Sequence, residues 1–482
     1  MSEELAETKM VELGHYTPLH QTELRQLLAS PAWQEVLASG LVEAARSERL
    51  EPGKTRDFIA TVVEQLLELN ETRVKELIVA GETDLRRLRH ELGRWPAELA
   101  GRRPKVSFLG LNLTAECNFV PRCVYCNQPW VEASVGLEGW KQIIEEVTRN
   151  NEGVGPYIYL TGGEPLVLGE EIWGEDGLIA YATRHGAAVN VNTNALLITP
   201  EVALRLVRAG LTRLHISLDT ADETVQNFLL GGARMERVLE GIYHVQLARD
   251  LTGAHWPEIH TNCVLTKRNL ELFPELLRFL LARKKQTVDR QDPFRHDLLP
   301  HVIPVGGRSN DALRPSSPEF RRFYGPVWDE VCTIWDEHQA TLGVAPEART
   351  AVFGYFSNPF LRVEHRGGLE AYAETSARGR YGSLALPDYC YVAPTQGSYT
   401  PDGLQFRCGS HAIRRIQPIG QHGEGGFFDH VQAGIAGLDA LPDADQCHGC
   451  ALATLYINQA VEKRLDERVA GLVQPVSQAA DT

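Results

Sequence analysis

The chain has 482 residues, of which 43% are hydrophobic, and a formal net charge of −15. That length exceeds one ordinary hydrophobic core, so we expect a large central domain with smaller units attached. The acidic charge argues against nucleic acid as a partner. No apolar run approaches the roughly 20 residues of a membrane span, and the start MSEELAETKM lacks the features of a signal peptide, so we expect a cytoplasmic protein with no membrane partner. In that compartment the nine cysteines favour metal ligands and buried thiols over disulfides.

The N-terminal part is expected to be helical. From about Thr22 to Leu99 apolar residues recur at helical spacing, as in FIATVVEQLLEL, with breaks at Pro31 and Pro96. A winged helix that binds a leader peptide would need a β-hairpin, and we find no alternating strand pattern in this part of the chain. Residues 1–104 are therefore expected to be a helical region that packs on the rest of the chain or covers it.

From Val106 onward, short apolar segments alternate with amphipathic helical ones. The expected strands are 106–113, 157–162, 187–193, 213–219, 258–266 and 301–306. Repeated β–α units imply parallel strands joined by right-handed crossovers, hence an α/β fold built as an incomplete barrel or an open sheet. In either architecture the active groups lie beyond the carboxyl ends of the strands.

The C-terminal half is less regular. Residues 308–385 are expected to connect the core to a small cysteine-bearing domain at 386–465, with helices around 318–342 in the connection. Residues 466–482 are expected to form a tail with a frayed end.

The segment LNLTAECNFVPRCVYCNQPW places Cys117, Cys123 and Cys126 within ten residues. A structural zinc takes four ligands, and an electron-transfer iron–sulfur cluster usually takes four cysteines. Three thiolates therefore suggest a metal centre with one coordination position left for another molecule.

Together with TGGEP at 161–165, this segment resembles the radical S-adenosylmethionine (radical SAM) enzymes, whose usual spacing is C-x3-C-x2-C. Here the spacing is C-x5-C-x2-C, and an aromatic residue, Tyr125, precedes the last cysteine as in the family. The two extra residues cost only a few tenths of a kcal/mol in loop closure. The resemblance implies a partial (β/α)6 barrel over residues 105–307. It also implies that the three cysteines hold a [4Fe–4S] cluster whose fourth iron binds SAM, and that a one-electron donor such as flavodoxin or ferredoxin reduces it. Reductive cleavage of SAM would give a 5′-deoxyadenosyl radical that abstracts hydrogen from a substrate.

The resemblance also implies a SAM pocket along the strand ends. Gly162, Gly163 and Glu164 resemble the motif that binds the SAM ammonium group, with Glu164 as a charge partner. The other implied SAM contacts are Tyr125, Asn192, Asn194, Ser217, Asp219, Asn262, Ile303 and Pro304. Each segment alone is explained equally well by turn chemistry, whereas their order is far more specific. No catalytic residue is assigned.

A second cysteine set follows, at Cys390, Cys408, Cys447 and Cys450. Four thiolates make a closed site, which a structural zinc fits as well as an iron–sulfur cluster does when the set is read without the core. Next to a radical SAM core, the spacing resembles the SPASM and twitch auxiliary-cluster domains. The shorter twitch type fits better because no cysteine follows Cys450, and it implies an auxiliary [4Fe–4S] cluster.

The sequence thus predicts a radical SAM oxidoreductase or maturase. Modification of a ribosomal peptide or protein side chain is favoured, because the N-terminal helices and residues 308–380 add surface beyond what a small substrate needs. The alternatives are a small-molecule dehydrogenase of the aminoglycoside or sugar type and, in another class, a non-enzymatic metal-binding protein.

Overall fold

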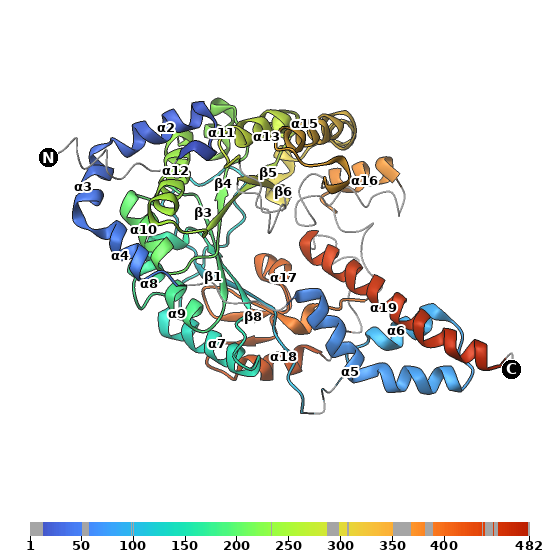
Figure 1. The fold of residues 1–482 in the computed structure, drawn as a ribbon. Helices are drawn as coiled ribbons and strands as arrows, with labels where there is room; N and C mark the ends of the chain where they lie inside the picture. The colour runs from blue at the N-terminus through green and yellow to red at the C-terminus, as the bar shows by residue number, and fades with distance from the viewer. Residues whose placement is uncertain are drawn as a thin grey trace.

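The structure is a computed structural model that describes residues 13–50, 57–97, 99, 101–232, 234–286, 298–305, 308–349, 368–380, 389–435, 437–438, 447 and 452–480. Among these residues, nine strands form one sheet in the order β6-β5-β4-β3-β2-β1-β7-β8-β9. Helices cover its outer side (Figure 1). Cys450 and Gly306, which the sequence analysis singled out, lie outside the described residues.

Six of the strands form the expected partial barrel. They are β1 (Phe108–Thr114), β2 (Tyr157–Gly162), β3 (Ala188–Thr193), β4 (Arg213–Ser217), β5 (Glu258–Leu265) and β6 (Leu299–Pro304), and each pairs in parallel with its neighbours. In β1, Leu109, Leu111 and Leu113 are buried, as expected where helices pack on a parallel sheet. The expectation of a partial (β/α)6 barrel is confirmed, and it puts the carboxyl ends of all six strands at one rim.

The helices between the strands follow the apolar periodicity of the sequence. They are α7 (Gly136–Asn150), α8 (Glu170–Trp173), α9 (Leu178–Arg184), α10 (Pro200–Arg208), α11 (Glu223–Leu229), α12 (Met235–Thr252) and α13 (Phe273–Leu281). In α10 the Thr199 side chain accepts a hydrogen bond from the Val202 amide at 3.2 Å, and Pro200 occupies the first turn. Leu204 and Leu206 are both buried.

Three short strands extend the sheet beyond β1, which the sequence analysis did not predict. They are β7 (Gln396–Tyr399), parallel to β1, followed by β8 (Leu404–Phe406) and β9 (Gly420–Gln421), which are antiparallel. Each is too short to show an alternating pattern. Helices α17 (Gly409–Arg414) and α18 (Phe427–Ile435) complete this unit. The cysteine-bearing C-terminal part is therefore joined to the barrel by backbone pairing with β1.

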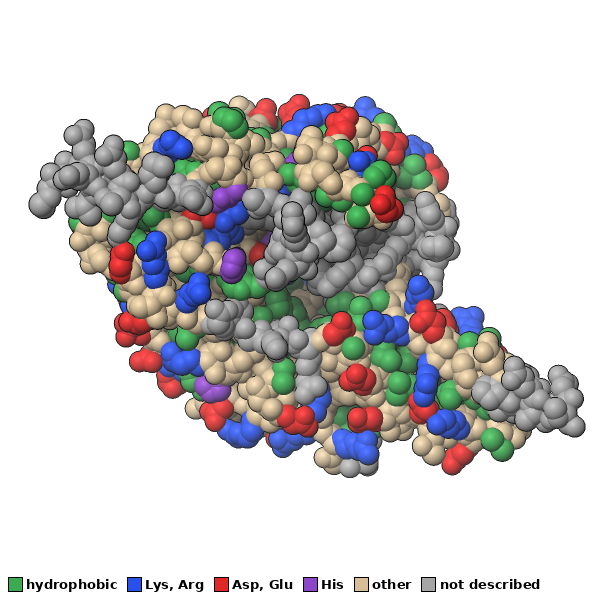
Figure 2. Space-filling view, viewed as in Figure 1, with side chains coloured by type: hydrophobic (Ala, Val, Ile, Leu, Met, Phe, Trp, Pro, Cys, Tyr) green, Lys and Arg blue, Asp and Glu red, His purple; other side chains and the backbone are tan. Residues whose placement is uncertain are grey.

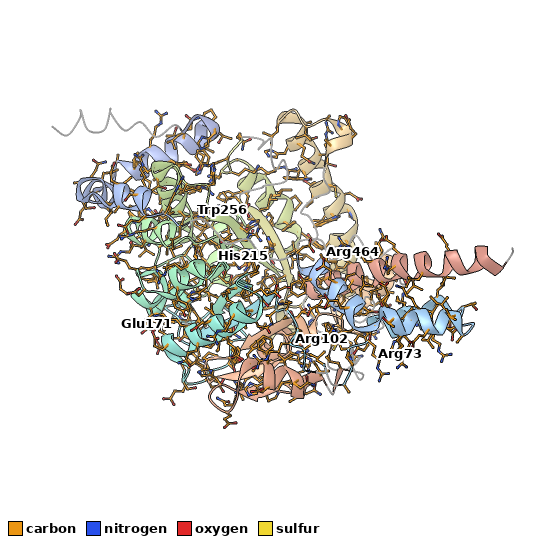
Figure 3. All side chains as sticks on the ribbon, turned by 60° about the horizontal axis from the view of Figure 1, so that its bottom comes forward. Arg73, Arg102, Glu171, His215, Trp256 and Arg464 are labelled. Atoms are coloured by element: carbon orange, nitrogen blue, oxygen red, sulfur yellow. The ribbon has the colours of Figure 1, made fainter. Side chains whose placement is uncertain are left out.

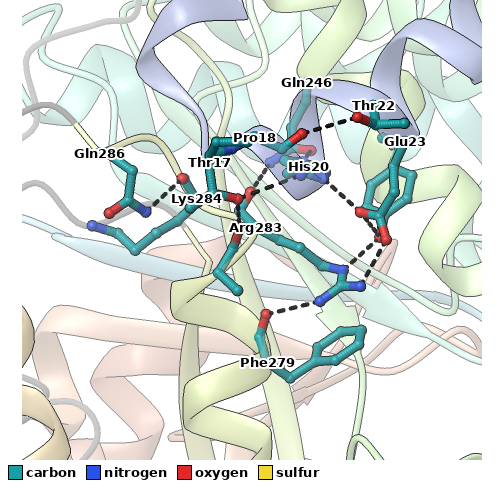
Figure 4. A network of polar contacts seen from close by, with 12 residues as sticks. Thr17, Pro18, His20, Thr22, Glu23, Gln246, Phe279, Arg283, Lys284 and Gln286 are labelled. Carbon is teal, nitrogen blue, oxygen red and sulfur yellow. Dashed lines mark hydrogen bonds and ion pairs between the residues drawn. The ribbon is translucent and has the colours of Figure 1, made fainter.

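The first N-terminal helices pack against the barrel helices. They are α2 (Pro18–Leu28), α3 (Pro31–Ser39) and α4 (Leu41–Ser47), and they contact α10 and α12. A buried polar network fixes α2 (Figure 4): the His20 ring nitrogens lie 2.9 Å from the Glu23 carboxylate and 2.8 Å from the Gln246 amide oxygen. Arg283 pairs with Glu23 at 2.7 Å. These contacts indicate that this part of the N-terminal region packs on the barrel and does not act as a mobile cover.

The next two helices pack elsewhere. Helices α5 (Phe58–Val79) and α6 (Leu85–Gly93) contact α19 (Leu452–Ala480), and the three project from the barrel (Figure 1). Arg468 pairs with Glu71 at 2.9 Å, and Lys and Arg are interspersed with Asp and Glu on this projection (Figure 2). The residues expected to form a tail after 465 continue α19 without a break.

The connecting segment carries α14 (Ser317–Arg322), α15 (Trp328–Thr341) and α16 (Gly368–Ala377), with a π-helical turn at Phe323–Val327. Helix α15 packs against α13, and α16 against α14. The helices expected around 318–342 are confirmed. Among the described residues, no helix is both long enough and apolar enough to span a bilayer.

Candidate functional site

The cysteine loop follows the carboxyl end of β1 and has little regular structure. It is fixed instead by contacts with distant residues. The Val124 amide donates to the Leu229 carbonyl at 3.0 Å, and Arg234 donates to the Val120 carbonyl at 3.0 Å while its guanidinium lies 4.0 Å from the Phe119 ring centroid. These contacts hold the loop against α11 and the start of α12.

The three cysteines of this loop differ in exposure. Cys117 and Cys123 are half-buried and Cys126 is exposed. Burial raises the pKa of Cys123 to about 12, so ligation requires the positive charge of metal to release its proton.

The glycines of the GGE motif let the end of β2 lie against this loop. Gly162 has φ +138°, and a Cβ there would meet the Thr114 carbonyl at 2.4 Å. A Cβ on Gly163 would meet the Glu116 carbonyl at 2.0 Å. The amides of Gly163 and Glu164 donate to the carbonyls of Thr114 and Glu116, both at 2.7 Å. Close backbone approach is therefore what both glycines provide.

The Glu164 carboxylate is fully buried between β2 and β3. One oxygen accepts from the Leu166 amide at 3.0 Å and the Thr193 hydroxyl at 2.8 Å, and the other accepts from the Asn194 amide at 2.7 Å. Burial raises the pKa of Glu164 to about 7, against the effect of these three donors. The side chain holds two strand ends together, and its second oxygen retains capacity for a further donor.

Most of the other expected SAM contacts are linked to one another at the rim. The Asn262 amide donates to the Asn192 amide oxygen at 2.6 Å. The Tyr125 hydroxyl donates to Asp219 at 2.7 Å, and the other Asp219 oxygen accepts from the Val264 amide at 2.7 Å. Burial raises the pKa of Asp219 to about 7.

The remaining expected contacts lie at the same rim. Asn194 donates to Asn118 at 2.6 Å and lies 3.9 Å from the Cys117 sulfur. Ser217 is half-buried and stands opposite Asn262 in the β4–β5 register. Ile303 is 42% exposed and pairs with Val264, and Pro304 follows it at the end of β6.

Two residues of this site were missed in the sequence. Asn118 receives the hydrogen bond from Asn194, and Asn310, in the 3-10 turn Arg308–Leu313, donates to the Tyr125 carbonyl at 2.9 Å and to the Asn127 side chain at 3.0 Å. Asn118 adjoins Cys117, which is a usable signal. Asn310 is 185 residues from its partner, and no local pattern marks it.

The second cysteine set converges in the described part of the C-terminal unit. Burial raises the pKa of Cys390 to about 12, and the nearby sulfurs of Cys408 and Cys447 add to the shift. Backbone amides of Val392 and Ala393 hydrogen-bond the Cys390 thiol. Cys408 is the N-cap residue of α17, and the nearby amides of Ser410 and His411 oppose the rise that burial causes in its pKa. Such N–H donors favour thiolates, so the site suits a metal centre.

The two cysteine sets lie at different levels of β1. A Cβ on Gly110 would lie 3.0 Å from the Ser398 hydroxyl, and the same hydroxyl is 3.9 Å from the Cβ position of Gly409, next to Cys408. Cys117 instead follows Thr114, four strand residues further on, which corresponds to roughly 13 Å.

Residues 111–280 match the family model described as the radical SAM superfamily. An AdoMet-dependent heme synthase from Methanosarcina barkeri is 34% identical over 213 residues, which are 43% of this chain and 54% of that protein. The mycofactocin maturase MftC from Mycobacterium tuberculosis is 30% identical over 166 residues, 34% of this chain and 39% of the maturase. The chain thus spans about half, or less, of the length of these curated relatives.

Among solved structures, the Streptococcus suis protein SuiB bound to S-adenosylmethionine is 16% identical, with a TM-score of 0.48, over 77% of this chain and 76% of SuiB. The cysteine loop, strands β2 to β5 and the second half of β1 fall inside the segment that matches the family model. Residues 111–280 are a radical SAM domain.

Proposed function

We propose that the protein is a radical SAM enzyme whose core spans residues 105–307. The observation that carries this proposal is the convergence at one rim of the cysteine loop, the two glycines of β2 and the polar strand ends. Cys117, Cys123 and Cys126 would hold the [4Fe–4S] cluster. Cluster and SAM together would supply a 5′-deoxyadenosyl radical for hydrogen abstraction.

The chain's own residues would position SAM. The backbone at Gly162 and Gly163 would receive the ammonium group, with the second oxygen of Glu164 as its charge partner. Asn192, Ser217 and Asn262 would line the path of the ribose and carboxylate, and Ile303 and Pro304 the adenosine. These assignments follow the resemblance to the family, and the placement of these residues along one rim supports them.

The second cysteine set is proposed to hold an auxiliary [4Fe–4S] cluster in a twitch-like domain over residues 386–465. The amide cradles around Cys390 and Cys408 support a metal centre, and the neighbouring radical SAM domain favours iron–sulfur over zinc. With four thiolates, counting Cys447 and Cys450, no position is left for SAM. Its role would be to accept an electron from a substrate radical or to hold the fold.

The proposed substrate is a ribosomal peptide or a protein side chain, and the proposed partner is a one-electron donor of the flavodoxin or ferredoxin type. The similarity to a mycofactocin maturase supports the peptide class. The projection formed by α5, α6 and α19 adds surface beyond a small-molecule pocket. A small precursor-peptide gene beside this gene would support this class, whereas sugar-biosynthesis genes would favour the dehydrogenase alternative.

The test is anaerobic reconstitution with iron and sulfide, followed by SAM and a strong reductant. The proposal expects 5′-deoxyadenosine by mass spectrometry, and with the right peptide a product that has lost two hydrogens or gained a cross-link. A reconstituted protein that never forms 5′-deoxyadenosine would refute the radical SAM activity. Formation of 5′-deoxyadenosine with turnover of a sugar alcohol, and none with candidate peptides, would refute only the substrate class.

A further inference from the structure

Three histidines meet inside the barrel, one layer below the proposed SAM contacts. His215 on β4, His260 on β5 and His301 on β6 have ligand-capable atoms that all lie within 4.8 Å of one another. Figure 3 shows His215 in the interior of the molecule among the barrel strands. Each histidine stands two residues before a rim residue, Ser217, Asn262 and Ile303, so the group lies roughly 7 Å deeper in the barrel.

The contact between two of the rings, which in this structure is a hydrogen bond, is close to the spacing of two ligands on one ion. His260 Nδ1 and His301 Nε2 are 3.1 Å apart. In a tetrahedral zinc site with Zn–N bonds of about 2.0–2.1 Å, two nitrogens are separated by ~3.4 Å. A small outward shift of either ring would therefore admit a metal.

Outer contacts orient two of the rings. His260 Nε2 faces the Glu258 carboxylate at 3.5 Å, and Arg213 fixes that carboxylate at 2.8 Å. A proton held on Nε2 by Glu258 leaves the Nδ1 lone pair directed at His301, which is the carboxylate–histidine arrangement common behind metal ligands. The Asn190 amide nitrogen lies 3.3 Å from His215 Nδ1, and the Asn190 amide oxygen has no partner among the described residues. Exchanging these two amide atoms would pair the oxygen with Nδ1–H and leave the Nε2 lone pair open.

His215 gives an independent sign that a ligand belongs here. Its ring is 7% exposed, and its buried Nε2 makes no hydrogen bond in the part of the chain that the structure describes. Leaving such an atom unsatisfied costs about 1–3 kcal/mol. Burial and the neighbouring imidazoles lower the pKa of His215, and burial lowers that of His301, so both rings are neutral and able to ligate at pH 7.

We propose that His215, His260 and His301 bind one divalent transition-metal ion of the zinc class inside the barrel. Three neutral imidazoles suit zinc and its borderline neighbours better than magnesium or calcium. In a tetrahedral geometry they leave one position for a water or an anionic oxygen. The ion would join β4, β5 and β6, the three strands at the edge of the sheet away from the C-terminal unit. This site is separate from both cysteine sets and does not depend on the proposed radical SAM activity.

The test uses the full chain, anaerobically reconstituted with iron and sulfide and then given one equivalent of zinc sulfate. After desalting, elemental analysis should find one zinc per chain, and zinc K-edge absorption should show imidazole nitrogens at about 2.0–2.1 Å. Zinc that is washed out, or zinc surrounded by sulfur at about 2.3 Å, overturns the proposal. This measurement needs no variant, so it remains decisive if a histidine replacement fails to fold.

Variants then locate the ion. His301→Gln removes a proposed ligand and should weaken zinc binding by more than the roughly 10–100-fold expected for Glu258→Gln, which removes only an orienting contact. His244→Gln is the matched control, because His244 is also buried but bonds to Trp33 on the outer helices. Equal zinc affinity in the parent and His301→Gln, or equal losses in His301→Gln and His244→Gln, would refute the assignment.

Discussion

Replacing Gly163 by alanine tests whether the end of β2 lies against the cysteine loop. The added Cβ would stand 2.0 Å from the Glu116 carbonyl and 2.7 Å from the Ala115 carbonyl, and real Cβ contacts essentially never fall below 3.0 Å. The backbone must therefore move by at least about 1 Å, which is 3.0 less 2.0. Both neighbours are backbone atoms, so no side-chain rotation can relieve the overlap.

The expected cost has two parts. Overpacking of this kind destabilises by roughly 1–3 kcal/mol. A displacement of about 1 Å between the loop and the proposed SAM-binding backbone should lower the rate of 5′-deoxyadenosine formation by about 100-fold. Anaerobic rate measurements, iron content and thermal unfolding of the reconstituted variant would report both parts.

The control is Gly471→Ala in α19, where an added Cβ meets nothing within 4 Å. It should leave iron content and rate at the parental level. If Gly163→Ala also keeps parental iron, rate and melting temperature, the loop does not pack on β2 as described, and the reasoning about this site fails.

Four further outcomes are expected. Alanine at all three loop cysteines should remove about half the iron and all SAM cleavage, and unchanged iron would exclude Cys117, Cys123 and Cys126 as ligands. Glu164→Gln should keep the cluster absorbance and weaken SAM binding, by roughly 1.5–3 kcal/mol in calorimetry; unchanged affinity would leave it only its structural role. Cys408→Ser should abolish product formation while slow, substrate-independent 5′-deoxyadenosine persists, and parental turnover would contradict an electron-acceptor role. Although burial opposes ionisation, the His15 ring, whose Nε2 lies 3.5 Å from the carboxylate, and the charge of Lys285 lower the pKa of Asp250 to about 2. A carboxyl group with a lowered pKa in the folded state stabilises the fold above pH 4, and this contribution is lost as the pH falls to about 2. Asp250→Asn should therefore lower the free energy of unfolding, measured by denaturant titration, by about 2 kcal/mol at pH 7 and by almost nothing at pH 2.

The barrel could be predicted because each strand and helix is long enough to show its own period. In α10, for example, Thr199, Pro200 and the buried leucines are all local signals. The extension by β7, β8 and β9 could not be predicted in this way, because β8 and β9 have three residues and two. Strand β7 is held by pairing with β1, which is far away in the sequence, and β8 and β9 are added to it in turn.

The candidate site likewise combines features with a local sequence signal and features that depend on distant residues. The cysteine triplet and the glycine pair are local patterns, and the structure gives the physical reason for the glycines in their contacts with Thr114 and Glu116. The partner of each polar rim residue was not visible in the sequence. Asn192 meets Asn262 across 70 residues, and Tyr125 meets Asp219 across 94. Only the strand order brings such pairs together.

Strand β1 contacts the segments that carry both cysteine sets. The carboxyl end of β1 leads into the loop with Cys117. The edge of β1 away from β2 pairs with β7, and this pairing places Ser398 between Gly110 and Gly409, the residue after Cys408. The C-terminal unit is therefore not tethered by a linker alone, because part of its sheet is the barrel's own sheet. A change that separates β7 from β1 would disturb the auxiliary cysteines first and would reach the loop through the same strand. For this reason, loss of auxiliary iron and loss of SAM cleavage must be measured in the same sample before an electron-transfer role is assigned to the second site.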